Sequence, residues 1–221
     1  LFISASALSL FSLTLKSQGW PSVSSTVRSR DNPDSNSKIY TGSSRALQNL
    51  EKTIKPLGDS PARSWDPPFC GDMNILIGRD GCWFHEGRLI RRKKLVQLFS
   101  TIIRLEKDGQ YYLVSPSEKL RIQVEDCPFV VNQMDVKFNE DDQIIVMTTN
   151  VGEVVEVSKE RPIKISDTEL GAPHPVIHIR DGLVALINRS VFYRLMELAE
   201  SVSGKIGVRS SGEFLSFEES V

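Results

Sequence analysis

The sequence feature that most constrains the fold of this chain is a segment that occurs twice. Residues 74–114 read as a strand, a tight turn, a second strand, an amphipathic helix and a second hairpin, and residues 176–217 read in the same order. The matching positions are Arg79-Asp80-Gly81 with Arg180-Asp181-Gly182, Leu89-Ile90 and Arg92 with Leu186-Ile187 and Arg189, Leu98 with Leu195, and Asp108-Gly109 with Ser211-Gly212. Self-similarity at this spacing is too long for a solenoid repeat and favours two related modules. Chance resemblance of two hairpin–helix–hairpin units is the alternative.

Hydrophobic periodicity predicts the elements inside these modules. Each copy carries one apolar stripe at helical spacing, formed by Leu95, Leu98, Phe99 and Ile102 in the first and by Phe192, Leu195, Met196 and Ala199 in the second. Residues 118–125 alternate between apolar and polar, which predicts a strand with one solvent-exposed face. Because this strand lies between the repeated units, its polar face as the lining of a ligand cleft is the alternative. Runs of strands with separated helices indicate an α+β fold. We therefore predict two β-rich domains related by duplication, each an antiparallel sheet packed on one helix.

The domain boundaries follow from where these patterns stop. We place an N-terminal domain at residues 43–126 and a C-terminal domain at residues 127–221, because Pro128 follows the last strand of the first module. Residues 1–42 are expected to be a non-native or disordered extension, since their apolar start is too short to span a bilayer comfortably. A truncated signal peptide is the alternative for that stretch. A short helix over residues 44–54 is expected to begin the ordered part.

Charge and cysteine content restrict the partners and the compartment. The chain has 27 basic and 28 acidic residues, so its overall charge favours neither a nucleic-acid polymer nor an anionic membrane as partner. Its three cysteines, Cys70, Cys82 and Cys127, contain no CxxC pair and leave an odd one over. Reduced thiols in a cytoplasmic protein explain this pattern more simply than a disulfide framework or a zinc site.

No catalytic signature is present in the sequence. GxSxG, P-loop and GxGxxG motifs are all missing. His174 and His178 would lie roughly 13 Å apart along a strand, too far for one metal ion. Glu125 and Asp126 would point to opposite strand faces and so form no acid/base pair. We therefore predict no catalytic residue, no metal ion and no cofactor.

A run of four cations at the start of the first helix is the most informative polar feature. Arg91-Arg92-Lys93-Lys94 opposes the helix dipole, but the same location is where backbone N–H groups collect anions. Arg189 recurs at the matching position of the second copy. Solvated surface charge is the equally weighted alternative. For Asp and Gly of the two RDG triplets, simple turn chemistry is the preferred interpretation.

Four long segments from Trp65 onward carry a family resemblance: WDPPFCGDMNILIGRDGCWFHEGRLIRRKKLVQLFSTIIR, YYLVSPSEKLRIQVEDCPFVV, TTNVGEVV and HIRDGLVALINRSVFYRLMELA. They resemble a bacterial family of uncharacterised proteins, the domain-of-unknown-function family numbered twelve eighty-five. The resemblance implies two β-rich domains that repeat a structural motif, the second superficially similar to pleckstrin-homology folds. It also implies a pocket at the domain interface for a nucleotide-like ligand, and a role in signalling. Residues up to about Gly42 have no counterpart in the family.

Two classes of function fit these observations. In the first, a cytoplasmic sensor or adaptor of bacterial signalling binds a small anionic or nucleotide-like ligand between its domains. The residues expected to form that site are Arg79, Trp83, Arg92, Lys119, Arg121, Arg180 and Arg189, with Trp83 stacking on the ligand. In the second, the chain is a protein-interaction module and its basic residues are incidental. Convergence of these arginines on one concave surface would favour the first class.

Overall fold

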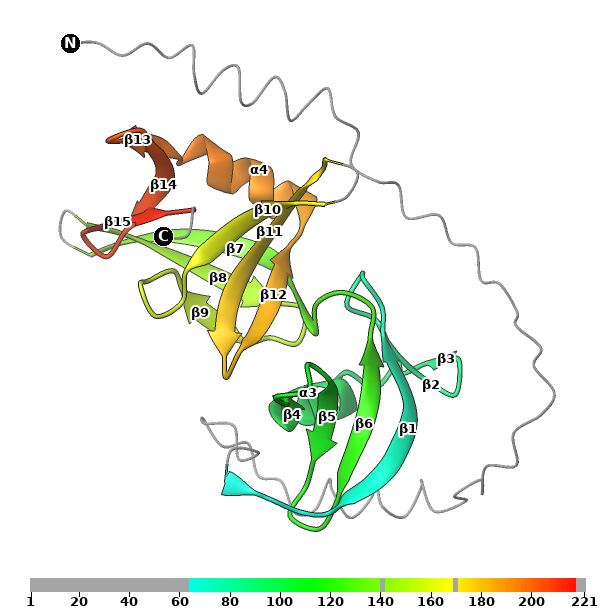
Figure 1. Ribbon diagram of the computed structural model, residues 1–221. Helices are drawn as coiled ribbons and strands as arrows, with labels where there is room; N and C mark the ends of the chain where they lie inside the picture. Colours follow the sequence, from blue (N-terminus) through cyan, green and yellow to red (C-terminus); the bar gives the residue numbers. More distant parts are fainter. Residues whose placement is uncertain (1–63, 140–141, 169–170, 218–221) are drawn as a thin grey trace.

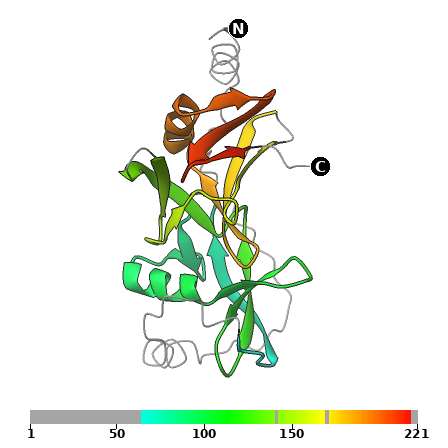
Figure 2. The same ribbon diagram turned by 90° about the vertical axis from the view of Figure 1, so that its left-hand side faces the viewer.

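The computed structural model describes residues 64–139, 142–168 and 171–217. Within these ranges the chain forms two β-rich halves, a first half up to Cys127 and a second half from Pro128. The second half lies above the first in Figure 1, and Figure 2 shows the same order after a quarter turn. The extension expected at residues 1–42 and the helix expected at 44–54 lie outside the described residues.

The first half is built on one mixed sheet, sheet A, and one helix. In spatial order the strands are β3 (Arg88–Leu89), β2 (Trp83–His85), β1 (Phe69–Ile77), β6 (Lys119–Val124), β5 (Tyr111–Val114) and β4 (Ile103–Leu105). Helix α3 (Lys93–Thr101) connects β3 to β4. It packs against the sheet through Phe99, whose ring stacks on Trp83 with the centroids 6.1 Å apart. The predicted apolar stripe of this helix is confirmed, because Phe99 and Ile102 are both 1 % exposed.

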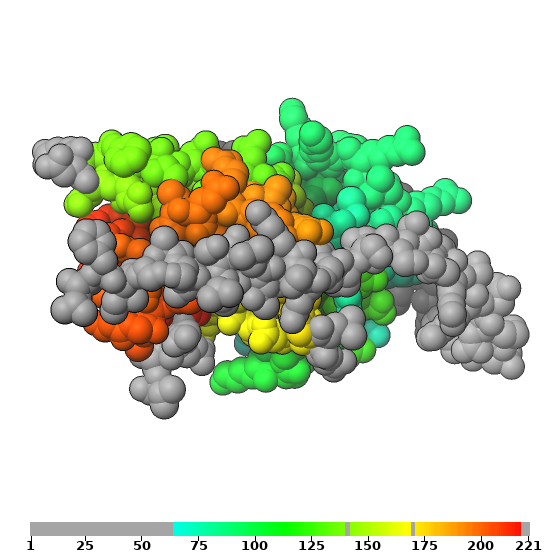
Figure 3. Space-filling model, turned by 90° about the horizontal axis from the view of Figure 1, so that it is seen from above, coloured from blue at the N-terminus to red at the C-terminus, as the bar shows by residue number. Residues whose placement is uncertain are grey.

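The second half contains a larger sheet B, a small sheet C and one helix. Sheet B runs β10 (Ile163–Asp167), β11 (Pro173–Arg180), β12 (Leu183–Ile187), β7 (Phe129–Asn139), β8 (Asp142–Thr149) and β9 (Val154–Glu156). Helix α4 (Arg189–Glu197) follows β12, and sheet C comprises β13 (Glu200–Val202), β14 (Lys205–Ser210) and β15 (Glu213–Ser216). Figure 3 shows α4 and sheet C, orange to red, beside the yellow-green β7 and β8, with the teal first half at the other end.

The prediction of purely antiparallel sheets is wrong. In sheet A, β1 and β6 run parallel, with Ile77 opposite Val124. In sheet B, β12 and β7 run parallel, with Ile187 opposite Val131. Parallel neighbours need a long crossover connection, and in sheet A that connection contains β2, β3, α3, β4 and β5. Alternation along a strand reports which face is wet, but it does not identify the neighbouring strand.

The two repeated segments share their element order only in part. Both contain a hairpin with an RDG turn, then a nine-residue helix, then a second hairpin. When the elements are matched in chain order from the helix onward, the predicted equivalence of Asp108-Gly109 with Ser211-Gly212 is wrong. The turn directly after the first strand that follows α4 is Ser203-Gly204, whereas Ser211-Gly212 closes the next hairpin, β14–β15. A common origin of the two segments stays a prediction.

One continuous apolar core runs through both halves. It joins Ile75, Trp83 and Phe99 of the first half to Phe129 and Phe192 of the second. The strand predicted at residues 118–125 is confirmed, with its apolar side toward this core and its polar side toward solvent. Neither helix of the described ranges is long and apolar enough to cross a membrane. Because the core is shared, the halves meet through packed side chains.

Candidate functional site

Both RDG turns lie where the two halves meet. In the turn between β1 and β2, the carbonyl oxygen of Gly81 accepts a hydrogen bond from Nδ2 of Asn150, at 2.8 Å. The Oδ1 atom of Asn150 accepts from the backbone N–H of Val130, at 3.0 Å. Gly81 has a φ of +76°, and a Cβ atom there would lie 2.5 Å from Asn150 Nδ2. This approach of the first turn to the second half therefore requires glycine.

The turn between β11 and β12 makes the reverse contact, from the second half to the first. Arg180 forms an ion pair with Glu153 and donates a hydrogen bond to the carbonyl oxygen of Ser100, at 2.7 Å. Its guanidinium carbon lies 5.3 Å from the ring centroid of Phe129. Ser100 is in the last turn of α3, where carbonyl groups attract cations. Arg180 thus makes three contacts within the protein, with Glu153, the carbonyl of Ser100 and the ring of Phe129.

A polar cluster stands at the same junction, in the segment that joins the halves. His174 Nε2 lies 2.8 Å from Asp126 Oδ1, and the thiol of Cys127 lies 3.4 Å from the same carboxylate oxygen. The side chains of His174 and Asp126 are 27 % and 23 % exposed, whereas Cys127 is 4 % exposed. We call Asp126, Cys127 and His174 the junction cluster. Their donor atoms all lie within 4.8 Å of one another.

Hydrogen bonding sets the protonation of this cluster. The single hydrogen bond in which the carboxylate of Asp126 accepts from protonated His174 raises the pKa of His174 and lowers the pKa of Asp126, so both carry charge over a wider pH range. Burial, with the nearby Asp126 carboxylate, raises the pKa of the Cys127 thiol. A neutral thiol lying against a carboxylate is a poor nucleophile. The cluster therefore has the residue types of a cysteine–histidine–aspartate enzyme but not their arrangement.

Arg79, in the first RDG turn, interacts electrostatically with the junction cluster. Its backbone N–H donates to Glu125 Oε2 at 3.1 Å, and the side chain is exposed. Within residues 64–139, 142–168 and 171–217 its guanidinium makes no hydrogen bond or ion pair. Its charge is close enough to the cluster to contribute to the lowered pKa of Asp126 and to oppose the raised pKa of His174. Among the described residues, Arg79 is thus a cation without a hydrogen-bond or ion-pair partner, near the charged Asp126–His174 pair.

Trp83 is not available to stack on a ligand, contrary to the role expected for it. Its ring is 1 % exposed and packs on Phe99 in the core. Its Nε1–H is buried and has no hydrogen-bond partner in the part of the chain that the structure describes. Trp83 begins β2 with its side chain on the covered face of sheet A. Its contribution is to packing.

Lys119 and Arg121 lie on β6 and are paired within the first half. Arg121 binds both carboxylate oxygens of Asp72, each at 2.8 Å. Lys119 pairs with Glu106 at 3.3 Å and stands 5.3 Å from the ring centroid of Tyr112. The polar face of β6 is therefore a set of internal ion pairs rather than the lining of a cleft.

Arg92 and Arg189 lie at the starts of the two helices. Arg92 occupies the N-cap position of α3 and makes no side-chain capping bond there. At α4 the cap is Asn188, whose Oδ1 accepts from the N–H of Val191 at 2.9 Å. Arg189 stands over Tyr193 of its own helix, 5.4 Å from the ring centroid. Of the seven predicted residues, Arg180 contacts the first half directly, and Arg79 belongs to the turn whose Gly81 contacts the second half.

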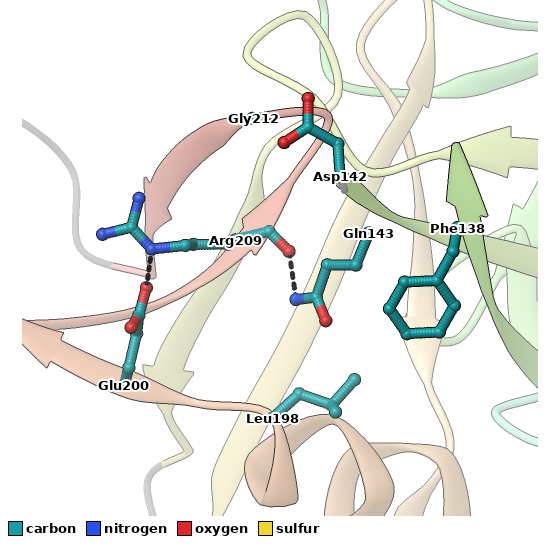
Figure 4. A pocket seen from close by; sticks show the side chains of 7 residues that line it. All are labelled: Phe138, Asp142, Gln143, Leu198, Glu200, Arg209 and Gly212. Atoms are coloured by element: carbon teal, nitrogen blue, oxygen red, sulfur yellow. Dashed lines mark hydrogen bonds and ion pairs between the residues drawn. The ribbon is translucent and has the colours of Figure 1, made fainter. Parts of the chain in front are cut away.

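A shallow pocket of about 420 Å³ lies in the second half, away from these residues (Figure 4). It is lined by Phe138, Asp142, Gln143, Leu198, Glu200, Arg209 and Gly212. Its polar walls are bonded to each other, because Arg209 pairs with Glu200 at 2.5 Å and its carbonyl oxygen accepts from Gln143 at 2.6 Å. The ring of Phe138 is 73 % exposed. The pocket contains none of the seven predicted residues.

The junction cluster was not predicted as a unit. Asp126 and His174 are 48 positions apart, and no spacing between them signals contact. The sequence suggested only that His174 and His178 would not share a metal ion. In the structure His174 lies against Asp126, whereas His178 Nε2 accepts a hydrogen bond from the N–H of Gly182. All three cysteines are free, as expected.

Comparison with known proteins identifies the family. Residues 60–127 match the N-terminal domain, and residues 128–217 the C-terminal domain, of the domain of unknown function DUF1285. The chain belongs to the DUF1285 family. A crystal structure of a DUF1285 family protein from Silicibacter pomeroyi DSS-3 is 41 % identical in sequence and superposes with a TM-score of 0.70. The match covers 77 % of this chain and 93 % of the Silicibacter chain.

A second DUF1285 family structure, from Shewanella baltica OS155, is 22 % identical over 57 % of this chain and 91 % of its own, with a TM-score of 0.46. No curated protein matches the chain. Membership of DUF1285 supports the two-domain architecture and leaves the activity open. The function of this DUF1285 protein therefore has to be argued from its own residues.

Proposed function

We propose that this DUF1285 protein is a non-enzymatic sensor that binds a small anionic ligand at the junction of its two halves. The observation that carries the proposal is the exposed guanidinium of Arg79, which has no partner among the described residues and lies near the Asp126–His174 pair. Arginine presents a planar fork of N–H groups that fits a carboxylate or phosphate. Protonated His174, on the second half, would supply a further positive group on the other side of the ligand.

The ligand class follows from what surrounds Arg79. The proposal needs a phosphate or carboxylate group, because Arg79 is positive and lies close enough to protonated His174 for their charges to interact. A nucleotide base loses its expected stacking partner, since Trp83 is buried in the core. We therefore narrow the proposed ligand to a compact anion, with a nucleotide as a weaker candidate.

The location explains how binding could act in signalling. Arg79 belongs to the first half and His174 to the second, so an anion that touches both would favour the packed arrangement of the halves. A ligand that binds only the folded arrangement stabilises it in proportion to the logarithm of its concentration. The signal would then be the ligand-dependent stability of the packed arrangement of the two halves.

A thermal-shift titration tests the proposal in the full chain with chelator present. Inorganic phosphate, dicarboxylates, phosphorylated metabolites and nucleotides are added in series, and the melting temperature should rise with concentration for at least one class. Arg79→Gln should remove the rise. Arg121→Gln is the matched control, because Arg121 is also exposed but already paired with Asp72. Equal shifts in both variants, or none in the unsubstituted protein, would contradict the proposal.

A second candidate function is docking of an acidic protein surface. Exposed cations lie close together at the start of α3, namely Arg88, Arg91, Arg92, Lys93 and Lys94, and the neighbouring Leu89 is 47 % exposed. The first turn of α3 contains no acidic residue. Charge complementarity therefore favours an acidic partner.

Poly-L-glutamate serves as the probe for this second function. Its binding should weaken steeply with added salt, because exposed charges are screened. The double change Lys93→Glu with Lys94→Glu should abolish it, and Lys205→Glu on β14 is the control. Binding that survives the double change would rule out this surface.

A further inference from the structure

We infer that Asp126, Cys127 and His174 form a binding site for one divalent transition-metal ion, with Zn²⁺ the best match. A carboxylate, a thiol and an imidazole are all ligands that zinc takes in proteins. Their donor atoms converge within 4.8 Å in the described part of the chain. The site goes beyond the proposed anion binding and departs from the sequence expectation of no metal.

The donor distances are close to those that a tetrahedral ion needs. With bonds of about 2.0–2.1 Å to nitrogen or oxygen and about 2.3 Å to sulfur, donors in such a site lie roughly 3.3–3.6 Å apart. Sγ of Cys127 is already 3.4 Å from Oδ1 of Asp126, and Nε2 of His174 is 2.8 Å from that oxygen. All three donor atoms lie within 4.8 Å of one another, so side-chain rotations that move these atoms by about 1 Å would admit the ion.

Metal binding would exchange protons for the ion. The charged His174 ring releases its Nε2 proton, and the neutral Cys127 thiol releases its Sγ proton, whereas Asp126 is already ionised. One ion thus displaces up to two protons and forms three bonds, to Nε2, Sγ and one carboxylate oxygen. The charge of a bound ion overcomes the reluctance of a buried thiol to ionise.

Burial and position determine the kind of metal site. Cys127 is 4 % exposed, but the side chains of Asp126 and His174 are about one-quarter exposed, which leaves a route to solvent and a fourth position for water or an anion. Asp126 and Cys127 lie in the segment that joins the halves, and His174 lies on β11 of the second half. A bound ion would therefore tie the halves together.

Arg79 provides an internal check on the site. Its positive charge repels a cation at the junction cluster, because it is close enough to perturb both Asp126 and His174. Arg79→Gln should therefore increase metal affinity several-fold. A Zn²⁺ ion beside the native Arg79 would, in turn, strengthen the binding of a small anion, which links this site to the proposed function without depending on it.

Titration with Co²⁺, a spectroscopic substitute for Zn²⁺, tests the site. The protein carries Cys70→Ser and Cys82→Ser so that a thiolate-to-cobalt absorption band reports Cys127 alone. The expected result is one tight equivalent with tetrahedral absorption, competed by Zn²⁺, and release of protons as the ion binds. His174→Gln should weaken binding by at least about tenfold, and Cys127→Ser should remove the charge-transfer band. His85→Gln, a histidine on β2, is the control.

The results of this titration test the metal site independently of the proposed anion binding. Absence of Co²⁺ and Zn²⁺ binding at micromolar concentrations, or binding that survives both His174→Gln and Cys127→Ser, would overturn the inference and leave Asp126–His174 as an ion pair only. Proton release and the Arg79→Gln effect are read in proteins with the native cluster, so they do not depend on the folding of the ligand variants. No anion is added here, and the anion test contains chelator, so the two proposals fail separately.

Discussion

The two RDG turns share a sequence but have different surroundings. Arg180 is enclosed by Glu153, the carbonyl of Ser100 and the ring of Phe129, so its charge is neutralised within the protein. Arg79 is exposed, and its guanidinium has no partner among the described residues. Both turns nevertheless reach across the same junction. We interpret one arginine as a structural tie between the halves and the other as available to a ligand.

The difference also shows in the glycines of the two turns. At Gly81 a Cβ atom would lie 2.5 Å from Asn150 Nδ2, whereas at Gly182 the nearest atom, Leu105 Cδ2, would be at an ordinary 3.5 Å. Both have positive φ, +76° and +75°. The first turn therefore contributes its backbone to the junction, and the second contributes its arginine side chain. The two identical triplets therefore contact the other half through different atoms, the backbone carbonyl of Gly81 and the guanidinium of Arg180.

The largest expected effect comes from adding one methyl group at the first turn. Gly81→Ala should lower the free energy of unfolding by about 3 kcal/mol, because the strained φ is joined by a clash that displaces Asn150. Gly182→Ala, the matched control, should cost only about 1 kcal/mol, from φ alone. Urea unfolding measures both. Equal losses would show that the first turn is not packed against Asn150 as described.

A smaller effect is expected from the arginines. Arg180→Ala should cost about 2 kcal/mol, because it removes charge-assisted hydrogen bonds and leaves Glu153 without its cation. Arg79→Ala should change stability by less than about 0.5 kcal/mol, as is usual for an exposed side chain without partners. The same unfolding experiment compares them. A destabilisation by Arg79→Ala as large as that by Arg180→Ala would remove the distinction between the turns.

The smallest expected effect on stability concerns the pH dependence of the Asp126–His174 pair, measured with chelator present. The raised pKa of His174 gives a contribution that is complete below 6.5, its ordinary value, and is lost as pH rises through the folded-state pKa. The lowered pKa of Asp126 gives a contribution present above 3.8 and lost as pH falls through its own folded-state pKa. Stability from the pair is therefore greatest between these limits.

His174→Gln should reduce both the loss of stability at acidic pH, the acidic edge, and the loss at alkaline pH, the alkaline edge. His85→Gln should leave both losses unchanged. Thermal unfolding from acidic to mildly alkaline pH provides the measurement. A profile that keeps the alkaline edge after His174→Gln would assign the edge to another group.

Local structure could be predicted from the sequence because periodicity records exposure. The stripes with Phe99 and Phe192 became helices, and the alternation around Ile122 became β6. Parallel pairing of β1 with β6 could not be predicted, because alternation does not encode the partner strand. The burial of Trp83 was missed for a related reason, since the strand was recognised but not which of its faces the helix covers.

The candidate site was predicted less well than the fold. Arg79 and Arg180 were selected because they recur in the repeat, and their turns do meet at the junction. Arg121 was selected because it lies on the polar face of a strand between the repeated units, and it is paired with Asp72. Asp126 and His174 come together only through the packing of the two halves, which no local pattern describes.

The most direct test of the account compares Arg79→Gln and Arg180→Gln in urea unfolding, with and without the anion that gives the largest thermal shift, in chelator. The account predicts that Arg180→Gln lowers the unfolding midpoint but keeps the anion-induced increase. It predicts that Arg79→Gln keeps the midpoint and loses the increase. An anion-induced increase that persists in Arg79→Gln, or disappears equally in both variants, would contradict the division of roles between the two turns.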